Sequence, residues 1–268
     1  MPQVFWSVSS FVERADKSVP VFFSAGNAGV GDLAESLAQS MRRVGLPFTF
    51  FASDFEAVHR MERVCDVVFD ERALSQLSIL RGRTAEPAAI GDEGFAPLAW
   101  IRYPLIGELL ANGLHASYLD SDIFVLRDFL GDIKSYLDRN NGVDGVVQMN
   151  DKGDACTGFM SFHPRAKGRF ARVYNERALM RGGYSSFGGL ADQAYFNDVL
   201  MKSRSRRRLR IQLLSRDLYP TGKWWVANHN ELGATAKIVH HNGVIGNQAK
   251  IEQMKRFGHW HAPDKTHE

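Results

Sequence analysis

Two aspartates, Asp120 and Asp122, lie between a mostly apolar segment, 114–119, and a second apolar run, 123–126. In an extended chain, residues i and i+2 point to the same face, so both carboxylates can reach one cation. A hard divalent ion prefers oxygen ligands and can in turn bind phosphate groups. Since an unpaired buried carboxylate is costly, a cation or an arginine is expected beside the pair. The spacing favours a metal-bridged phosphate ester as substrate, with a solvated turn as the alternative for so short a motif.

Two histidines could complete such a site. His240 and His241 follow a short strand expected at 237–239, and an imidazole from either could join the two carboxylates. Adjacent histidines are also common on protein surfaces, and in an extended chain only one of them can face a shared ion. The pattern alone leaves ligation and surface exposure both open.

Three more polar residues belong to expected helices. Arg102 lies in a segment expected to be helical over 97–112, which leads directly to the aspartates. Its guanidinium could pack between its aromatic neighbours or bind a phosphate or a carboxylate. Asp192 and Gln193 open a helix expected over 191–197, where an acid and an amide also serve ordinary helix-start chemistry.

The elements that must position these groups alternate along the chain. Residues 19–24 predict a strand and residues 25–29 predict a loop. The apolar residues that come next at helical spacing predict a helix, which Asp32 would cap and Gly45 would stop. Residues 48–51 predict the next strand. This order of strand, glycine-containing loop, helix and strand begins an α/β sheet, whose ligands bind at the carboxyl ends of its strands.

The loop after the first strand contains Gly26-Asn27-Ala28-Gly29, which matches neither GxGxxG nor GxxxxGK[ST]. It predicts a tight turn rather than a phosphate cradle, with contact to a nucleotide base or ribose as the functional alternative. Two further strands are expected at 143–149 and 158–162. The polar turn 150–154 and Cys156-Thr157 separate them, and functional groups could cluster in that gap.

The composition is that of an ordinary globular protein. With 268 residues, 44% hydrophobic and 24% charged, the chain is expected to form one domain over 1–268. A net charge of +3 suits an anionic ligand and is far below that of a protein that coats nucleic acid. The two cysteines, Cys65 and Cys156, lack CxxC spacing and predict free thiols in a reducing compartment. No window approaches the roughly 18 apolar residues of a membrane span, and the N-terminus lacks a secretory pattern, so we expect a cytoplasmic protein.

The segment 202–210 is rich in lysine and arginine and could contact an anionic membrane surface or a nucleic acid. No aromatic residues interleave it, whereas single-strand binding usually adds stacking platforms. We therefore expect a solvated loop and no nucleic-acid partner, with peripheral membrane contact as the alternative.

Five short motifs follow one another along the chain. They are Tyr118-Leu119-Asp120-Ser121-Asp122, Cys156-Thr157-Gly158-Phe159-Met160, Ala191-Asp192-Gln193 through Asn197, Leu218-Tyr219-Pro220-x-Gly222, and His240-x-Asn242-Gly243. In this order they resemble the motifs of nucleotide-diphospho-sugar transferases, most closely the retaining GT-A glycosyltransferases that include plant cell-wall xylosyl-, arabinosyl- and galactosyltransferases. The resemblance runs from about residue 102 to 260. It implies a single α/β domain of the Rossmann-like GT-A type, with a mixed, mostly parallel central sheet flanked by helices.

The resemblance also implies a metal-dependent enzyme in which Asp120 and Asp122 bind the cation and His240 supplies the late ligand. An imidazole in an oxygen-rich site favours Mn2+, with Mg2+ as the alternative. The donor would be a nucleotide-diphosphate sugar, with uridine diphosphate as the expected carrier, and the acceptor a glycan or glycoconjugate. Asp192 and Gln193 would lie beside the sugar as catalytic groups. Contacts to the donor are implied for Arg102, Ser121, Thr157, Gly158, Asn242, Gly243, Gly246 and Lys250. Contacts of Ser24 and Asn27 with the nucleotide are expected from the place of their loop at the carboxyl end of a strand.

One residue departs from the family pattern, because Cys156 stands where these transferases usually have asparagine, and this bears on the donor sugar. Two other functions stay open. Asp-x-Asp also opens the site of haloacid-dehalogenase-type phosphatases and related hydrolases, although Gly-Thr typically continues that motif and Ile123-Phe124 follows here. A non-catalytic module would bind the nucleotide sugar without turnover. Acceptor contacts are expected in the loops 80–95 and 180–190.

Overall fold

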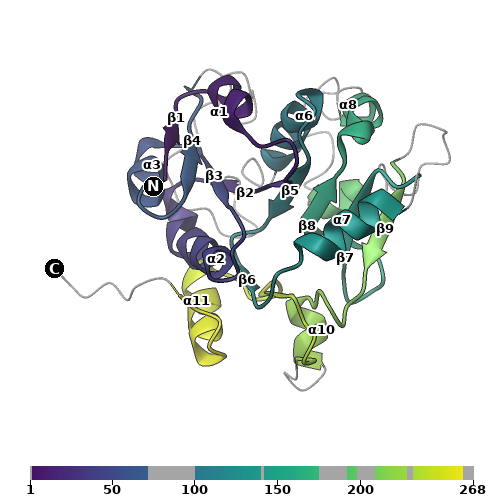
Figure 1. The fold of residues 1–268 in the computed structure, drawn as a ribbon. Coiled ribbons are helices and arrows are strands. Elements are labelled where there is room, and N and C mark those ends of the chain that lie inside the picture. The colour runs from purple at the N-terminus through teal and green to yellow at the C-terminus, as the bar shows by residue number, and fades with distance from the viewer. Residues whose placement is uncertain are drawn as a thin grey trace.

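The computed structural model describes residues 2–71, 100–139, 142–174, 192–197, 209–227 and 232–261. In these ranges an eight-stranded sheet has the order β1-β4-β3-β2-β5-β8-β7-β9 (Figure 1). Its strands are β1 (Val4–Phe5), β4 (Asp66–Val68), β3 (Thr49–Ala52), β2 (Val21–Gly26), β5 (Ala116–Leu119), β8 (Ala155–Phe162), β7 (Gly145–Met149) and β9 (Ile211–Leu214). The first five of these are parallel to one another, β8 is antiparallel to both of its neighbours, and β9 is parallel to β7. The predicted α/β class with a mixed, mostly parallel sheet is confirmed.

Helices cover both faces of this sheet. One face carries α1 (Val8–Arg14), α6 (Arg102–Ala111) and α8 (Lys167–Tyr174), and the other α2 (Gly31–Arg43), α3 (Phe55–Met61) and α7 (Leu130–Arg139). Neighbouring residues of a strand point to opposite sides of the sheet, so their order in the sequence decides which side chains pack with which group of helices. In β2, Phe23 packs with the first group of helices and Phe22 with the second.

A second, two-stranded sheet joins the C-terminal part of the chain to the centre. It pairs β6 (Ile123–Val125) with β10 (Ile238–His240) in antiparallel register, with Ile123 opposite His240. The short helices α9 (Asp192–Tyr195) and α10 (Gly222–Ala227) and the helix α11 (Asn247–Arg256) complete the elements considered below, with two 3-10 turns at Ala28–Val30 and Pro164–Ala166.

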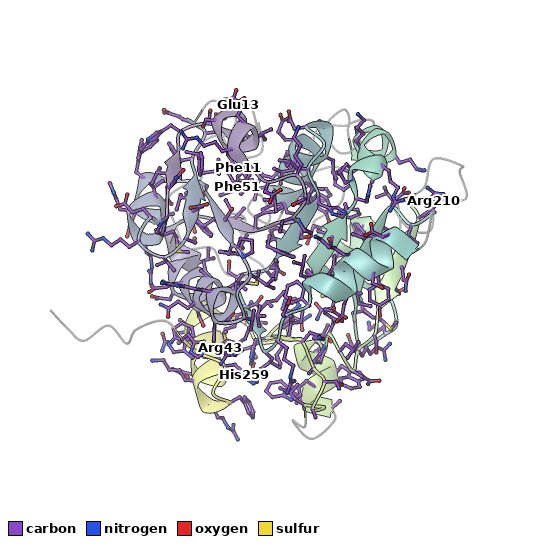
Figure 2. All side chains as sticks on the ribbon, viewed as in Figure 1. Phe11, Glu13, Arg43, Phe51, Arg210 and His259 are labelled. Atoms are coloured by element: carbon purple, nitrogen blue, oxygen red, sulfur yellow. The ribbon has the colours of Figure 1, made fainter. Side chains whose placement is uncertain are left out.

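Helix α11 lies against α2, as Figure 1 shows for the yellow and purple ribbons. Leu33 of α2 shares a buried apolar cluster with Phe124 and Met254. Arg43 and His259 lie close together at this junction (Figure 2), where the Arg43 guanidinium is 5.3 Å from the Phe124 ring centre and His259 stacks on the same ring. The C-terminal segment is thereby fixed beside the strand that follows the two aspartates.

Most predicted elements are present, but the predictions at Asp32 and at Cys156-Thr157 are wrong. Asp32 does not cap its helix, because α2 begins at Gly31; Asp32 lies in the first turn and pairs with Arg60. Cys156 and Thr157 do not lie in a gap between strands, because β8 runs without interruption through both of them. Their side chains are therefore held at fixed positions on a buried strand.

Several predictions fall outside the described residues, namely the loops 80–95 and 180–190 and most of the basic segment 202–210. The expected single domain over 1–268 stays a prediction. Cys65 and Cys156 are both buried and unbridged. Among the described residues, no helix combines the length and the apolar character that crossing a membrane requires.

Candidate active site

The two aspartates lie at the carboxyl end of β5, a central strand of the sheet. The backbone through them is a turn rather than the extended segment that the sequence suggested, since Ile123 N donates to Asp120 O at 3.0 Å before β6 begins. Asp120 N also donates to Gly158 O of β8 at 2.7 Å. The turn nevertheless directs both carboxylates to one place. Asp122 is buried and Asp120 is 27% exposed in its side chain.

The pairing of β6 with β10 brings His240 to this turn. His240 Nε2 lies 3.1 Å from Asp122 Oδ1 and 3.5 Å from Asp120 Oδ2. His241 points away from the carboxylates: its backbone N–H donates to Asp122 O, and its ring contacts Gln253 at 3.0 Å. The alternation of a strand therefore selects His240 of the two histidines for the cluster.

This cluster fits a divalent cation. The ligand atoms of Asp120, Asp122 and His240 all lie within 4.8 Å of one another. An ion about 2.1 Å from each ligand places neighbouring ligands about 3 Å apart when its bonds are perpendicular, close to the separations found here. Space for the imidazole exists only because residue 158 is glycine, since a Cβ there would overlap the His240 ring. Two carboxylates and an imidazole suit a divalent cation that accepts both oxygen and nitrogen ligands.

Lys250 of α11 supplies the nearest positive charge, with Nζ 2.7 Å from Asp122 Oδ2. Burial raises the pKa of the Asp122 carboxyl, but Lys250 and His240 outweigh it and hold that pKa well below its usual range. Burial also lowers the pKa of His240, and the Asp122 carboxylate reverses this and raises it to about 10. Without a cation, His240 therefore carries two ring protons at neutral pH.

The affinity for Mn2+ is expected to rise with pH, because His240 must release a proton before Nε2 can bind the ion. With a pKa of about 10, one proton leaves for each ion bound, so affinity should increase about tenfold per unit between about pH 7 and 9. The raised pKa stabilises the metal-free fold fully below about pH 6.5, and this contribution is lost as the pH rises towards 10. Manganese titrations followed by electron paramagnetic resonance at several pH values would measure the slope, and a flat profile would contradict ligation by His240.

Arg102 lies on the other side of the carboxylates and is buried in the first turn of α6. Its Nη1 is 3.1 Å from Asp120 Oδ1 and donates to Thr157 O at 3.0 Å. The guanidinium lies over the Tyr118 ring, 4.4 Å from its centre, and the Tyr118 hydroxyl donates to Asp120 at 2.8 Å. Because the guanidinium is held by an ion pair, a carbonyl and an aromatic face, its position is fixed before any ligand arrives.

Asp192 and Gln193, at the start of α9, meet the same strand β8. Asp192 Oδ2 accepts hydrogen bonds from the hydroxyls of Thr157 at 3.0 Å and Tyr103 at 3.2 Å, and Arg102 Nε is 3.7 Å away. Burial is the main cause that raises the pKa of the Asp192 carboxyl, opposed by the Arg102 charge. Gln193 Oε1 accepts from Thr157 N at 3.4 Å. The two candidate catalytic groups and Thr157 thus form one hydrogen-bonded unit joined to Asp120 through Arg102.

The other predicted donor contacts lie around this unit. Ser24, in β2, and Ser121 are within hydrogen-bond distance of each other at 3.0 Å. Asn27 is buried and caps the turn that follows, its Oδ1 accepting from Gly29 N. These residues lie at the carboxyl ends of neighbouring strands, beside the carboxylates.

Asn242, Gly243 and Gly246 shape the backbone between β10 and α11. Asn242 Oδ1 accepts from Gly222 N at 2.7 Å, and its amide nitrogen donates to Cys156 Sγ at 3.5 Å. Gly243 and Gly246 have φ of 95° and 89°, a region that glycine adopts without strain. One buried polar residue here, Gln148, was not among the predicted site residues, and its signal in the sequence is a glutamine inside the apolar run of β7.

A family model described as nucleotide-diphospho-sugar transferase matches residues 50–254, more than half of the chain. This chain belongs to that family. A UDP-galactose:fucoside alpha-3-galactosyltransferase of Dictyostelium discoideum is 24% identical over 197 residues. That alignment covers 65% of this chain and 29% of the relative, so the chain spans less than a third of the relative's length.

The crystal structure of mouse xyloside xylosyltransferase 1, in its apo form, resembles the fold with a TM-score of 0.54 at 12% identity. The similarity covers 84% of this chain and 98% of the mouse chain. At this identity the likeness concerns the fold alone, and it agrees with the GT-A architecture expected for a nucleotide-diphospho-sugar transferase.

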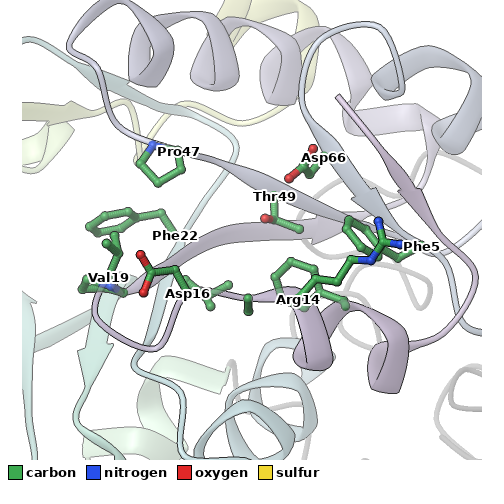
Figure 3. Close-up of a pocket in the computed structure, with 12 residues that line it drawn as sticks. Phe5, Arg14, Asp16, Val19, Phe22, Pro47, Thr49 and Asp66 are labelled. Carbon is green, nitrogen blue, oxygen red and sulfur yellow. The ribbon is translucent and has the colours of Figure 1, made fainter. Parts of the chain in front are cut away.

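The structure also has a pocket of about 180 Å³ that does not belong to this site. Figure 3 shows Phe22, Pro47, Thr49 and Asp66 lining it, with Asp16 between Val19 and Arg14. Thr49 and Asp66 are the first residues of β3 and β4, so the pocket lies at the amino ends of the parallel strands. The carboxylate cluster lies at the opposite edge of the sheet, where ligands of α/β proteins bind.

Proposed function

We propose that this chain is a metal-dependent, retaining glycosyltransferase that moves a sugar from a uridine diphosphate sugar to a glycan or glycoconjugate acceptor. The observation that carries the proposal is the cluster of Asp120, Asp122 and His240, flanked by Arg102 and Lys250. A metal site flanked by the positively charged side chains of Arg102 and Lys250 suits the negative charge of a diphosphate. The donor named for the galactosyltransferase relative, UDP-galactose, supports uridine diphosphate as the carrier.

Asp120, Asp122 and His240 would hold the cation, with Mn2+ favoured and Mg2+ as the alternative. When bound, this ion supplies positive charge that stabilises the departing diphosphate. Lys250 adds a second charge: one of its three N–H groups is used by Asp122, which leaves the others for phosphate oxygens. Arg102 contributes the third, already oriented by its contacts with Asp120 and Thr157.

Asp192 and Gln193 are assigned to the reacting sugar. Breaking the bond from sugar to phosphate leaves positive character on the ring, and a nearby carboxylate stabilises it. The two hydroxyl contacts of Asp192 converge on Oδ2 and orient the carboxylate, so we assign Oδ1 to the sugar. Gln193 would orient donor hydroxyls, and the leaving phosphate would help to deprotonate the acceptor in a retaining reaction.

The acceptor and the location of the enzyme are part of the same proposal. We place acceptor contacts in the loops 80–95 and 180–190. A cytoplasmic enzyme could use the basic run 202–210 at an anionic membrane surface, because about 1 kcal/mol is gained for each basic residue held there.

The test is a calorimetric titration of a panel of uridine nucleotides and nucleotide sugars, with and without Mn2+. We expect one sugar nucleotide to bind only when Mn2+ is present. Asp120→Asn should weaken this binding by more than the ~10–100-fold that typically follows the loss of a residue that only supports a metal ligand. Asp16→Asn is the matched control, because Asp16 is a carboxylate at the opposite edge of the sheet.

Turnover separates the alternatives. Transfer to simple glycosides with the donor's anomeric configuration kept, read by proton magnetic resonance, supports the proposal. Release of the sugar to water alone, even with acceptors present, indicates a hydrolase. Binding without any turnover indicates a non-catalytic module, and no nucleotide binding at all would contradict the assignment of the site.

A further inference from the structure

Gln148 lies beside the His240 ring, on the side opposite the two carboxylates. It belongs to β7 and its side chain has no exposed surface. Gln148 Oε1 is 3.0 Å from His240 Nδ1, whereas His240 Nε2 faces Asp120 and Asp122. The imidazole is therefore held between a neutral amide on one side and two carboxylates on the other.

The orientation of this amide follows from its other contacts. Gln148 Nε2 donates to the carbonyl oxygens of Tyr219 at 3.0 Å and Pro220 at 3.1 Å. Turning the amide over would bring its oxygen against these two carbonyls, which can only accept hydrogen bonds. The oxygen must consequently face His240 Nδ1, and that nitrogen must be the donor.

This arrangement decides which ring nitrogen can bind a cation. A neutral imidazole has one N–H, and the carboxylates of Asp120 and Asp122 favour its placement on Nε2, where it would block ligation. Gln148 opposes them, because its oxygen offers a hydrogen bond to a proton on Nδ1. Cys156 Sγ is 3.6 Å from the same nitrogen and is only a weak acceptor.

We propose that Gln148 is a positioning residue of the metal site, which keeps the proton of His240 on Nδ1 and presents the Nε2 lone pair to the divalent cation. This inference rests on the proposed function, since it requires that Asp120, Asp122 and His240 bind the ion. Partners of this kind, which bond the second nitrogen of a ligating histidine, typically contribute ~10–100-fold to metal affinity.

The first test is Mn2+ affinity, measured by electron paramagnetic resonance on the nucleotide-free protein. Gln148→Met has a similar volume without donor or acceptor, and we expect it to bind Mn2+ ~10–100-fold more weakly. Gln253→Met is the matched control, because Gln253 makes the same 3.0 Å contact with Nδ1 of His241, which points away from the cluster. The control should keep wild-type affinity, and the unfolding midpoint of each variant shows whether the fold is intact.

The second test reads the proton itself and does not depend on a variant that folds. In 15N-histidine spectra of the wild type loaded with cadmium-113, Nδ1 of His240 should carry the proton and Nε2 should couple to the metal.

Each result has a separate meaning. Coupling of the metal to Nδ1, or equal Mn2+ affinity of Gln148→Met and wild type, would overturn the role of Gln148 and leave the metal site intact. A wild-type protein that binds neither ion would contradict the proposed function together with the inference.

Discussion

Asp122→Asn is expected to destabilise the metal-free protein by about 3–5 kcal/mol, the usual cost of removing one partner of a buried ion pair. Asp122 is buried and stands between Lys250 Nζ at 2.7 Å and His240 Nε2 at 3.1 Å. The amide has almost the same shape, so the change removes charge, leaves Lys250 without its ion-pair partner and leaves His240 with only its longer contact to Asp120. Urea unfolding at pH 7 would show a lower midpoint with an unchanged slope.

The pH dependence of this loss has a definite sign. The folded-state pKa of Asp122 is depressed, so its contribution is complete above the unfolded value of about 4 and disappears as the pH falls further. The difference between wild type and Asp122→Asn should therefore shrink on acidification. Asp120→Asn is the comparison, because Asp120 is partly exposed and should cost less. Equal stability of Asp122→Asn and wild type would show that the ion pair with Lys250 is not formed.

The sequence was sufficient for the parts of the site that lie close together along the chain. The apolar run before Asp120 suggested an extended chain, and β5 does end at Leu119. Two carboxylates two residues apart predicted a shared cation, and they do converge, although through a turn rather than an extended segment. Local spacing limits the possible geometries so strongly that either backbone brings the pair together.

The choice between His240 and His241 could not be made from the pattern itself. It depends on the register of β10 against β6, which places His240 opposite Ile123 across more than a hundred residues of sequence. Only the resemblance to a family favoured His240 beforehand. Long-range register depends on packing throughout the core, and adjacent residues of one type carry no information about it.

Polar residues inside strands misled the sequence analysis. Cys156 and Thr157 suggested a gap, yet both belong to the buried strand β8. A hydroxyl or an amide is tolerated there when a distant residue satisfies it, as Asp192 does for Thr157. Partners so far apart in sequence leave no local trace, which also explains why Gln148 was overlooked.

Gly158→Ala is expected to disable the metal site although it adds only one methyl group. The new Cβ would lie 2.7 Å from His240 Nδ1, 2.8 Å from Nε2 and closer still to Cε1. His240 is 2% exposed and held from behind by Gln148, so the ring cannot retreat without breaking its contacts. We expect Mn2+ affinity to fall at least ~100-fold, because an imidazole ligand is displaced, and stability to fall by about 1–3 kcal/mol from overpacking.

Two comparisons make this result specific to the approach of glycine and imidazole. Gly131→Ala, in α7, places its Cβ in open space, and it should leave Mn2+ binding unchanged and stability equal or slightly higher. In a His240→Ala background the ring is absent, so Gly158→Ala should then cost almost nothing in unfolding free energy. A double-mutant cycle measures this coupling. If the losses of unfolding free energy are additive, residue 158 is constrained by its backbone conformation. If the coupling energy is as large as the loss caused by Gly158→Ala alone, the close contact with His240 is the reason for glycine in β8.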